Sequence, residues 1–383
     1  MGLNDFFSKT MVLERTIGVL SYCLVVVVSY NKLKLCTTKK QCDLILNIST
    51  LFFGILAFFY IPSVDADLYR WQRISEGWYN ISFPIFFKEH MVNNATPLAY
   101  LFMYICAKTR LSGILPASCA LMFYHNSFSI LKDLQTLDRD EKYKDLISTS
   151  YLLFMSSGAF LEVISGVRCF VAFSFIARAF YFEIYKEKNI FKSVPSYVIA
   201  ALIHNAVIPI VGIRVIYYLF QKSTNVRKKI ANFVAVLTLL LIAYIYGRGY
   251  IDSAFDKATN YIFGEKYSYF WEYIIGGFQW LIFTYIISES KKIKELSIQT
   301  KNMIKINKLL LIIEIAFAYE YNIFHRLVLV SSLLIIPIIK LFNENKDQSN
   351  KTLSNLKLAA VLIIMIACAR GNLCGYKFFL LSS

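Results

Sequence analysis

The chain has 383 residues, of which 57% are hydrophobic and 17% are charged, and 41 lysines and arginines against 25 acids give it a net charge of +16. A soluble domain averages about 45–50% apolar and about 25% charged residues, so the composition excludes a disordered protein and argues against an ordinary soluble enzyme. We expect an all-α polytopic integral membrane protein. Its basic excess then reflects the positive-inside rule, and no nucleic-acid partner is expected.

Apolar runs long enough to cross a bilayer, about 20 residues each, recur along the whole chain. They predict about ten transmembrane helices in a single transmembrane domain that covers residues 1–383. The runs lie at about 16–31, 43–61, 113–131, 146–164, 166–185, 229–247, 270–288, 307–321, 324–341 and 357–374.

The apolar stretch 97–109 is too short to cross. It follows a loop rich in Trp and Phe and ends in basic residues, a pattern typical of helices on a membrane surface. We therefore expect surface helices over 72–110, within an external loop that spans 62–112. A second external loop is expected over 248–269.

Residues 195–220 are long enough to span, but lysines and arginines flank them on both sides. Because both flanks belong in the cytoplasm, we expect a re-entrant helical hairpin with its tip near Asn205–Pro209. With the N-terminus outside, the inner loops then hold 25 Lys/Arg in 80 residues and the external segments 13 in 106. This bias supports the predicted topology.

The external loop 62–112 opens, directly after a span, with Asp65, Asp67, Tyr69 and Arg70. A carboxylate at the membrane surface can orient a nucleophilic hydroxyl or act as a base. The alternative is a solvated turn, because acidic residues are common in loops.

Basic residues occupy two further external positions. Arg168 ends a short turn in which Gly166 allows a tight bend, and its planar fork suits phosphate oxygens. His325 and Arg326 open the span 324–341, and two basic groups there could hold a pyrophosphate. The alternative for all three is contact with lipid headgroups.

His204 lies inside the proposed hairpin. An ionisable residue in a membrane segment is a functional hypothesis by default, and the alternative is a histidine satisfied by a neighbouring helix. The sequence contains no clustered set of metal ligands at a fixed spacing, so we expect no metal and no cofactor.

Apart from His204, the candidates fall on the external face, which lacks ATP and nucleotide sugars. They include Asp65, Arg70, Arg168, His325 and Arg326. Chemistry there must use a pre-activated donor, and a lipid pyrophosphate suits both the arginines and the membrane.

Short motifs follow one another in a characteristic order over residues 43–342. They are Asp65-Ala-Asp-Leu-Tyr69 after a span, Gly166-Val-Arg168 before a helix rich in small residues, Ala-Ala-Leu-Ile-His204-Asn, and Arg326-Leu327. This order resembles that of the bacterial Wzy/EpsG-type polysaccharide polymerases. Asp65, followed by Pro97-Leu98 and the span 113–131, is also similar to the GT-C glycosyltransferase layout, although Ser63-Val64 stands where that family has a glycine.

The resemblance implies a GT-C-like polymerase of undecaprenyl-pyrophosphate-linked oligosaccharide repeat units, for O-antigen or capsule, in the bacterial inner membrane with a periplasmic active face. It assigns catalysis to Asp65, Arg168 and Arg326, and leaves open whether Asp65 or Asp67 is the acid. Substrate binding would fall to Asp67, Tyr69, Arg70, His204 and His325. Membrane lipids and a chain-length regulator protein are the expected partners. The alternatives are a lipid-linked oligosaccharide flippase or transporter, and a GT-C glycosyltransferase with a polyprenyl-phosphate sugar donor.

Overall fold

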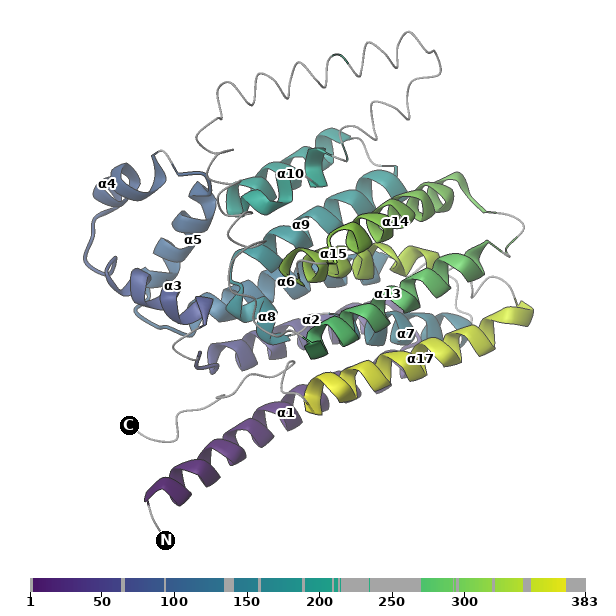
Figure 1. The fold of residues 1–383 in the computed structure, drawn as a ribbon, viewed down its shortest axis with the longest axis horizontal. Coiled ribbons are helices and arrows are strands. Elements are labelled where there is room, and N and C mark those ends of the chain that lie inside the picture. The colour runs from purple at the N-terminus through teal and green to yellow at the C-terminus, as the bar shows by residue number, and fades with distance from the viewer. Residues whose placement is uncertain are drawn as a thin grey trace.

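A computed structural model gives the fold, in which the described residues form helices joined by turns and short loops, with no strand among them (Figure 1). The expected all-α class is therefore confirmed. The described residues are 3–62, 66–92, 94–133, 141–157, 160–187, 190–208, 210–212, 214, 234, 270–291, 293, 296–318, 321–339 and 346–369.

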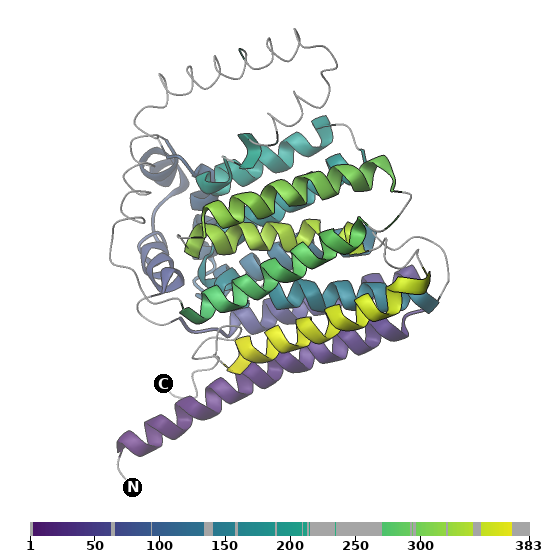
Figure 2. The same ribbon diagram turned by 45° about the vertical axis from the view of Figure 1, so that its right-hand side comes forward.

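The longer helices lie side by side along one direction and form a bundle (Figures 1 and 2). They are α1 (Leu3–Leu35), α2 (Lys39–Phe58), α6 (Ile114–Asp133), α7 (Glu141–Ser157), α9 (Cys169–Phe180), α10 (Ile190–Ile203), α13 (Phe270–Ser290), α14 (Ile298–Ala316), α15 (Tyr321–Leu334) and α17 (Lys346–Ala369). In this bundle α2 packs on α6, α9 on α10, and α7 on α1 and α17.

Three helical segments of the described chain are long and apolar enough to cross a membrane: Ile17–Leu35, Lys39–Phe58 and Ile114–Asp133. Apolar side chains on the outside of α2, such as Leu51 and Phe52, are exposed, as expected of a surface that faces lipid. The predicted runs that the structure describes all fall on helices, whereas 229–247 lies outside the described residues except for Val234. The full number of crossings stays a prediction.

The start of α2 is determined by its local sequence. The Thr38 hydroxyl accepts a hydrogen bond from the Gln41 N–H at 3.3 Å, and the Gln41 side chain accepts one from the Thr38 N–H at 3.2 Å. This reciprocal capping box satisfies two N–H groups at the helix end.

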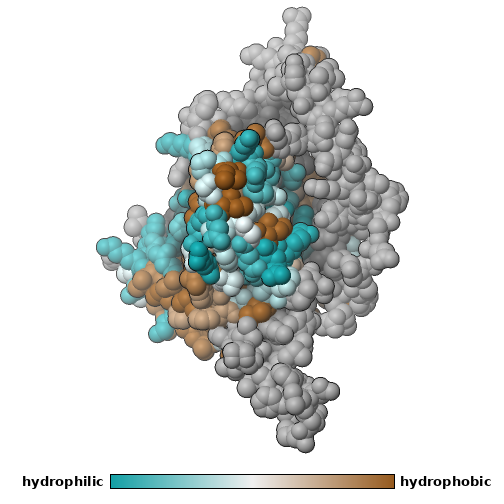
Figure 3. Space-filling model, turned by 90° about the vertical axis from the view of Figure 1, so that its left-hand side faces the viewer, coloured by the Kyte–Doolittle hydropathy of each residue, from teal (hydrophilic) through white to brown (hydrophobic). Residues whose placement is uncertain are grey.

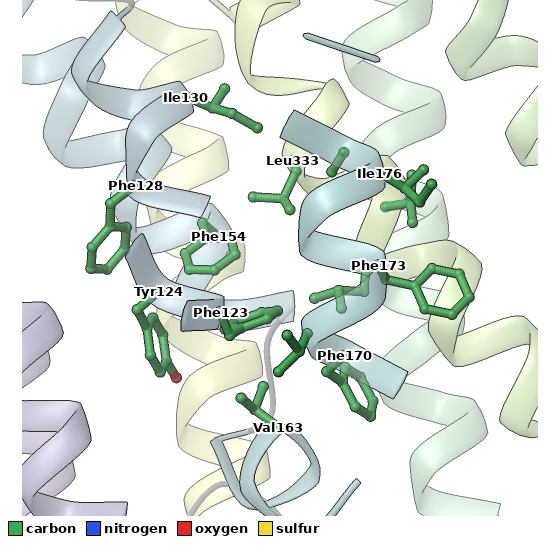
Figure 4. Packing of buried hydrophobic residues seen from close by; sticks show 14 of the residues in the cluster. Phe123, Tyr124, Phe128, Ile130, Phe154, Val163, Phe170, Phe173, Ile176 and Leu333 are labelled. Carbon is green, nitrogen blue, oxygen red and sulfur yellow. The ribbon is translucent and has the colours of Figure 1, made fainter. Parts of the chain in front are cut away.

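Aromatic side chains fill the centre of the bundle (Figure 4). The rings of Phe53 on α2 and Tyr124 on α6 stack with their centroids 4.3 Å apart. A Cβ atom at Gly54 would lie 2.7 Å from a methyl carbon of Leu121, so the glycine permits this close approach of α2 and α6.

Four short elements lie together at one end of the bundle (Figure 1) and form a subdomain outside it, which we name the external subdomain. They are α3 (Asp67–Glu76), α4 (Phe83–Phe86), the π-helical turn η1 (Phe87–Met91) and α5 (Pro97–Lys108). With 12 residues, α5 is as short as the sequence predicts. The described surface at this end is hydrophilic over its middle, with hydrophobic residues between and beside the hydrophilic ones (Figure 3).

The aromatic residues of this subdomain divide into two groups. Trp71, Trp78 and Phe86 form its interior, with Trp78 and Phe86 edge to face at 5.1 Å, whereas Phe83 and Phe87 are exposed. The first group therefore supplies the core that these short helices need, whereas Phe83 and Phe87 stay available for the surface contact that the sequence predicts for 72–110.

Candidate functional site

The tight turn Gly166-Val-Arg168 joins α8 (Phe160–Ser165) to α9. The Gly166 N–H donates to the carbonyl oxygen of Glu162 at 2.8 Å, and a Cβ atom at Gly166 would lie 2.8 Å from that same oxygen. Val167 adopts a φ of +33°, which is rare for a β-branched residue. Strained backbone of this kind clusters at functional sites, where the surrounding structure holds it in place.

The side chain of Arg168 is half-buried between the external subdomain and the bundle. Its guanidinium lies 4.3 Å from the ring centre of Trp71, and Nη1 is 3.4 Å from the hydroxyl of Thr96. Burial lowers the pKa of Arg168 from its ordinary value, and nearby Tyr100 and Asp67 act in the opposite direction. Arginine stays protonated despite such a shift, so the turn presents a fixed cation.

The N-terminus of α9 adds to this positive field. Arg168 occupies the N-cap position, and no side chain among the described residues caps the helix there. The Cys169 N–H already donates to the Gly166 carbonyl oxygen at 2.9 Å, and the helix dipole and the remaining N–H groups of the first turn favour an anion at such an end. Arg168 and the first turn of α9 are therefore suited to hold phosphate oxygens.

A second basic segment reaches the same place from α15. His325 is buried, its Nε2 pairs with the carboxylate of Glu162, and its ring lies edge-on to Phe170 at 5.9 Å. Cys169, the first residue of α9, lies within electrostatic range of Arg326 and Arg168. The structure thus brings both predicted arginines to the head of α9.

Two acids lie within the same electrostatic range of Cys169: Asp67, which the sequence singles out, and Glu162, which it does not. The one feature of the sequence that could have pointed to Glu162 as a site residue is its position four residues before Gly166. Its contact with His325 joins α8 to α15, a pairing of distant segments that hydropathy does not predict.

Residues of α3 line the outer side of the site. Asp67 and Arg70 pair at 2.7 Å on the exposed face of the helix, while Leu68 and Trp71 turn inward. Tyr69 is half-buried. Asp65 lies outside the described residues, so the choice between Asp65 and Asp67 as the acid stays open.

His204 ends α10 and caps the 3₁₀ turn Asn205–Val207, which contacts α9. Its Nδ1 accepts a hydrogen bond from the Ala206 N–H at 3.1 Å. This bond, to the backbone two residues further on, gives His204 a local structural role, and its role in binding substrate stays a prediction.

After the turn Asn205–Val207, the chain contacts the π-helical turn that directly follows α9. The Glu183 carboxylate, in the π-helical turn η2 (Tyr181–Tyr185), accepts hydrogen bonds from the Tyr197 hydroxyl at 2.6 Å and from Arg214 Nε at 3.2 Å. Tyr197 precedes the break at His204 and Arg214 follows it, so both arms of the segment reach one carboxylate. Residues 215–220 lie outside the described residues, and the re-entrant hairpin stays a prediction.

Known proteins supply no relative for this chain: no protein-family model, no curated protein and no solved structure matches it. Among the described residues, no group of three or more His, Cys, Asp or Glu could hold a metal ion. The candidate site consists of two arginines, a helix N-terminus, a Glu–His pair and an aromatic wall, all at one end of the bundle.

Proposed function

We propose that this protein polymerises lipid-linked oligosaccharide repeat units of O-antigen or capsule type. The growing glycan is transferred from undecaprenyl pyrophosphate to a hydroxyl at the non-reducing end of a new lipid-linked unit. The proposal includes the finer architecture expected from the sequence: about ten crossings, a GT-C-like layout, and an inner-membrane location with a periplasmic active face.

The observation that carries the proposal is the meeting of Arg168 and Arg326 at the head of α9. Both lie within electrostatic range of Cys169, the first residue of α9, although they come from segments far apart in the chain. Two cations at an uncapped helix N-terminus suit a pyrophosphate better than a single headgroup phosphate. The half-buried position strengthens such contacts, because screening by water is weaker there.

In the proposed reaction, Arg168 and Arg326 bind the donor pyrophosphate and stabilise its charge as the bond to the sugar breaks. Asp65 orients the acceptor hydroxyl or takes its proton. Asp67, Tyr69, Arg70, His204 and His325 contact the bound lipid-linked units. The scheme requires no nucleotide and no metal.

Replacement of Arg168 tests this function in cells. We expect Arg168→Ala to reduce surface polysaccharide to single repeat units at a normal protein level. Arg73→Ala is the matched control, because Arg73 lies on α3 at the same end but is exposed and pairs only with its neighbour Glu76 at 2.9 Å among the contacts described. Long chains from Arg168→Ala would contradict the proposal.

The same experiment separates the alternatives. A changed repeat unit would indicate a modifying glycosyltransferase that uses a polyprenyl-phosphate sugar. Accumulation of lipid-linked units on the cytoplasmic face would indicate a flippase.

A further inference from the structure

The Glu162–His325 pair connects the two segments that carry the arginines. Glu162 lies on α8, and its carbonyl oxygen closes the turn that ends in Arg168. His325 lies on α15 directly before Arg326. The contact between the two side chains therefore joins both arginine segments at the head of α9.

The two partners differ in their exposure. The Glu162 side chain keeps 27% of its surface accessible, whereas that of His325 keeps 9% and packs against the ring of Phe170. A substrate that enters the site can therefore touch the carboxylate, while the imidazole is held behind it. In carboxylate–histidine pairs the inner partner sets the orientation and charge of the outer one.

We propose that Glu162 takes the proton of the acceptor hydroxyl, and that His325 is a positioning residue that holds the Glu162 carboxylate in place. This inference rests on the proposed polymerase function and assigns within it a role that the sequence left with Asp65. Asp65 then orients the acceptor hydroxyl.

Three other described acids are bound elsewhere. Asp67 pairs with Arg70 on the solvent side of α3. Glu183 pairs with Arg214, and Glu314 is fully buried and accepts a hydrogen bond from Ser331. Glu162 combines partial exposure with proximity to Cys169, which lies within electrostatic range of both arginines.

The proposed step balances without an added reagent. The acceptor O–H bond breaks and its proton moves to a Glu162 oxygen. The acceptor oxygen forms a bond to the anomeric carbon of the donor glycan. The bond between that carbon and the phosphate oxygen breaks, and its electron pair leaves with undecaprenyl pyrophosphate, which Arg168 and Arg326 hold.

The test uses the purified full-length protein and a defined undecaprenyl-pyrophosphate-linked repeat unit. General-base catalysis contributes about 10²–10⁴-fold, so we expect Glu162→Gln to lower kcat by at least about 100-fold. The KM should stay near the wild-type value, because the arginines that bind the donor are unchanged. Glu76→Gln, an exposed acid at the same end of the bundle, is the matched control and should keep full activity.

Three further variants separate chemistry from folding. Glu162→Ala should regain part of its lost rate with added formate, which supplies a carboxylate to the space left by the side chain. His325→Gln can still donate a hydrogen bond to Glu162, so it should keep a higher kcat than His325→Phe at equal protein level and unfolding temperature. A purely structural role for the pair would move the unfolding temperature and would not give formate rescue.

The failures of the two proposals are distinguishable. If the wild-type protein elongates the repeat unit and Glu162→Gln does so within about threefold, the role of Glu162 is wrong and the polymerase function stands. If His325→Phe equals wild type, the positioning role is wrong. If the folded wild-type protein does not elongate the unit, the polymerase function fails and this inference falls with it.

Discussion

The guanidinium of Arg168 lies 4.3 Å from the ring centre of Trp71, so the turn at the head of α9 is held against the external helix α3. Thr96, just before α5, contacts the same guanidinium. A cation at the end of the bundle is thus fixed by side chains of the external subdomain. The position of that subdomain and the geometry of the proposed donor site are therefore linked.

The first prediction concerns this cation–π contact. A half-buried contact of this kind is worth about 1–2 kcal/mol, so Trp71→Leu should lower kcat/KM for elongation by about tenfold. Trp71→Phe keeps an aromatic face, so its kcat/KM should fall less than that of Trp71→Leu. Arg168→Lys keeps the charge but loses the planar fork, so its kcat/KM should lie between the values of wild type and Arg168→Ala. Equal activity of Trp71→Leu and wild type would show that the contact does not position Arg168.

A second prediction concerns Lys108, at the end of α5. Its ammonium group donates to the carbonyl oxygens of Trp78, Tyr79 and Ile81 at 3.1, 3.0 and 2.6 Å. Lys108→Met removes these hydrogen bonds, each of which contributes about 0.5–1.5 kcal/mol to stability. We expect amide hydrogen exchange over 77–82 to accelerate by about threefold to tenfold.

Lys108→Arg is the matched control, because a guanidinium can donate to the same carbonyl groups. If amide exchange over 77–82 is equal in Lys108→Met and wild type, the Lys108 hydrogen bonds do not hold this segment.

A third prediction concerns the ion pair of Glu183 and Arg214, whose side chains keep only 4% and 6% of their surface exposed. Removal of one partner from a buried pair costs about 3–5 kcal/mol, because it leaves an uncompensated charge. Arg214→Met should therefore lower the unfolding temperature of the purified protein strongly. The double variant Glu183→Gln/Arg214→Met should recover part of the loss.

The exposed pair Arg73–Glu76 serves as its comparison. Exposed pairs contribute about 0–1 kcal/mol, so Arg73→Met should leave the unfolding temperature almost unchanged. Similar losses for Arg214→Met and Arg73→Met would contradict a stabilising role of the buried pair.

A fourth prediction separates the two aspartates at the start of the external loop. Asp67 is exposed and already paired with Arg70, so Asp67→Asn should reduce chain elongation by less than about tenfold, in line with the small value of exposed pairs. Asp65→Asn should abolish long chains, because this acid is expected to orient the acceptor. The lengths of surface polysaccharide in the two strains decide the question, and the reverse order would assign the role to Asp67.

Local features of this protein are readable from its sequence. The apolar runs coincide with helices wherever the structure describes them, and the short stretch 97–109 became the 12-residue α5. The turn that ends in Arg168 lies where Gly166 predicts it. Hydrophobicity and glycine determine structure within a few residues, so their effects do not depend on how the helices are arranged.

Contacts between distant segments were not predictable in this way. The pairing of Glu162 with His325 depends on α8 and α15 being neighbours at the head of α9, and hydropathy carries no information on that order. The inward position of Trp71 likewise depends on the packing of α3 against α5. Arg168 could be singled out because a charge at a glycine turn is a local signal, whereas nothing local marks Glu162, because its partner His325 lies far away in the chain.

The most direct test of the polymerase function is elongation by the purified protein of a defined undecaprenyl-pyrophosphate-linked repeat unit, with no nucleotide sugar present. We expect a ladder of lipid-linked products spaced by one repeat unit, with release of undecaprenyl pyrophosphate, and a single unextended band with Arg168→Ala. A folded wild-type protein that leaves the repeat unit unextended, or extends it only when a nucleotide sugar is added, would contradict the proposed function.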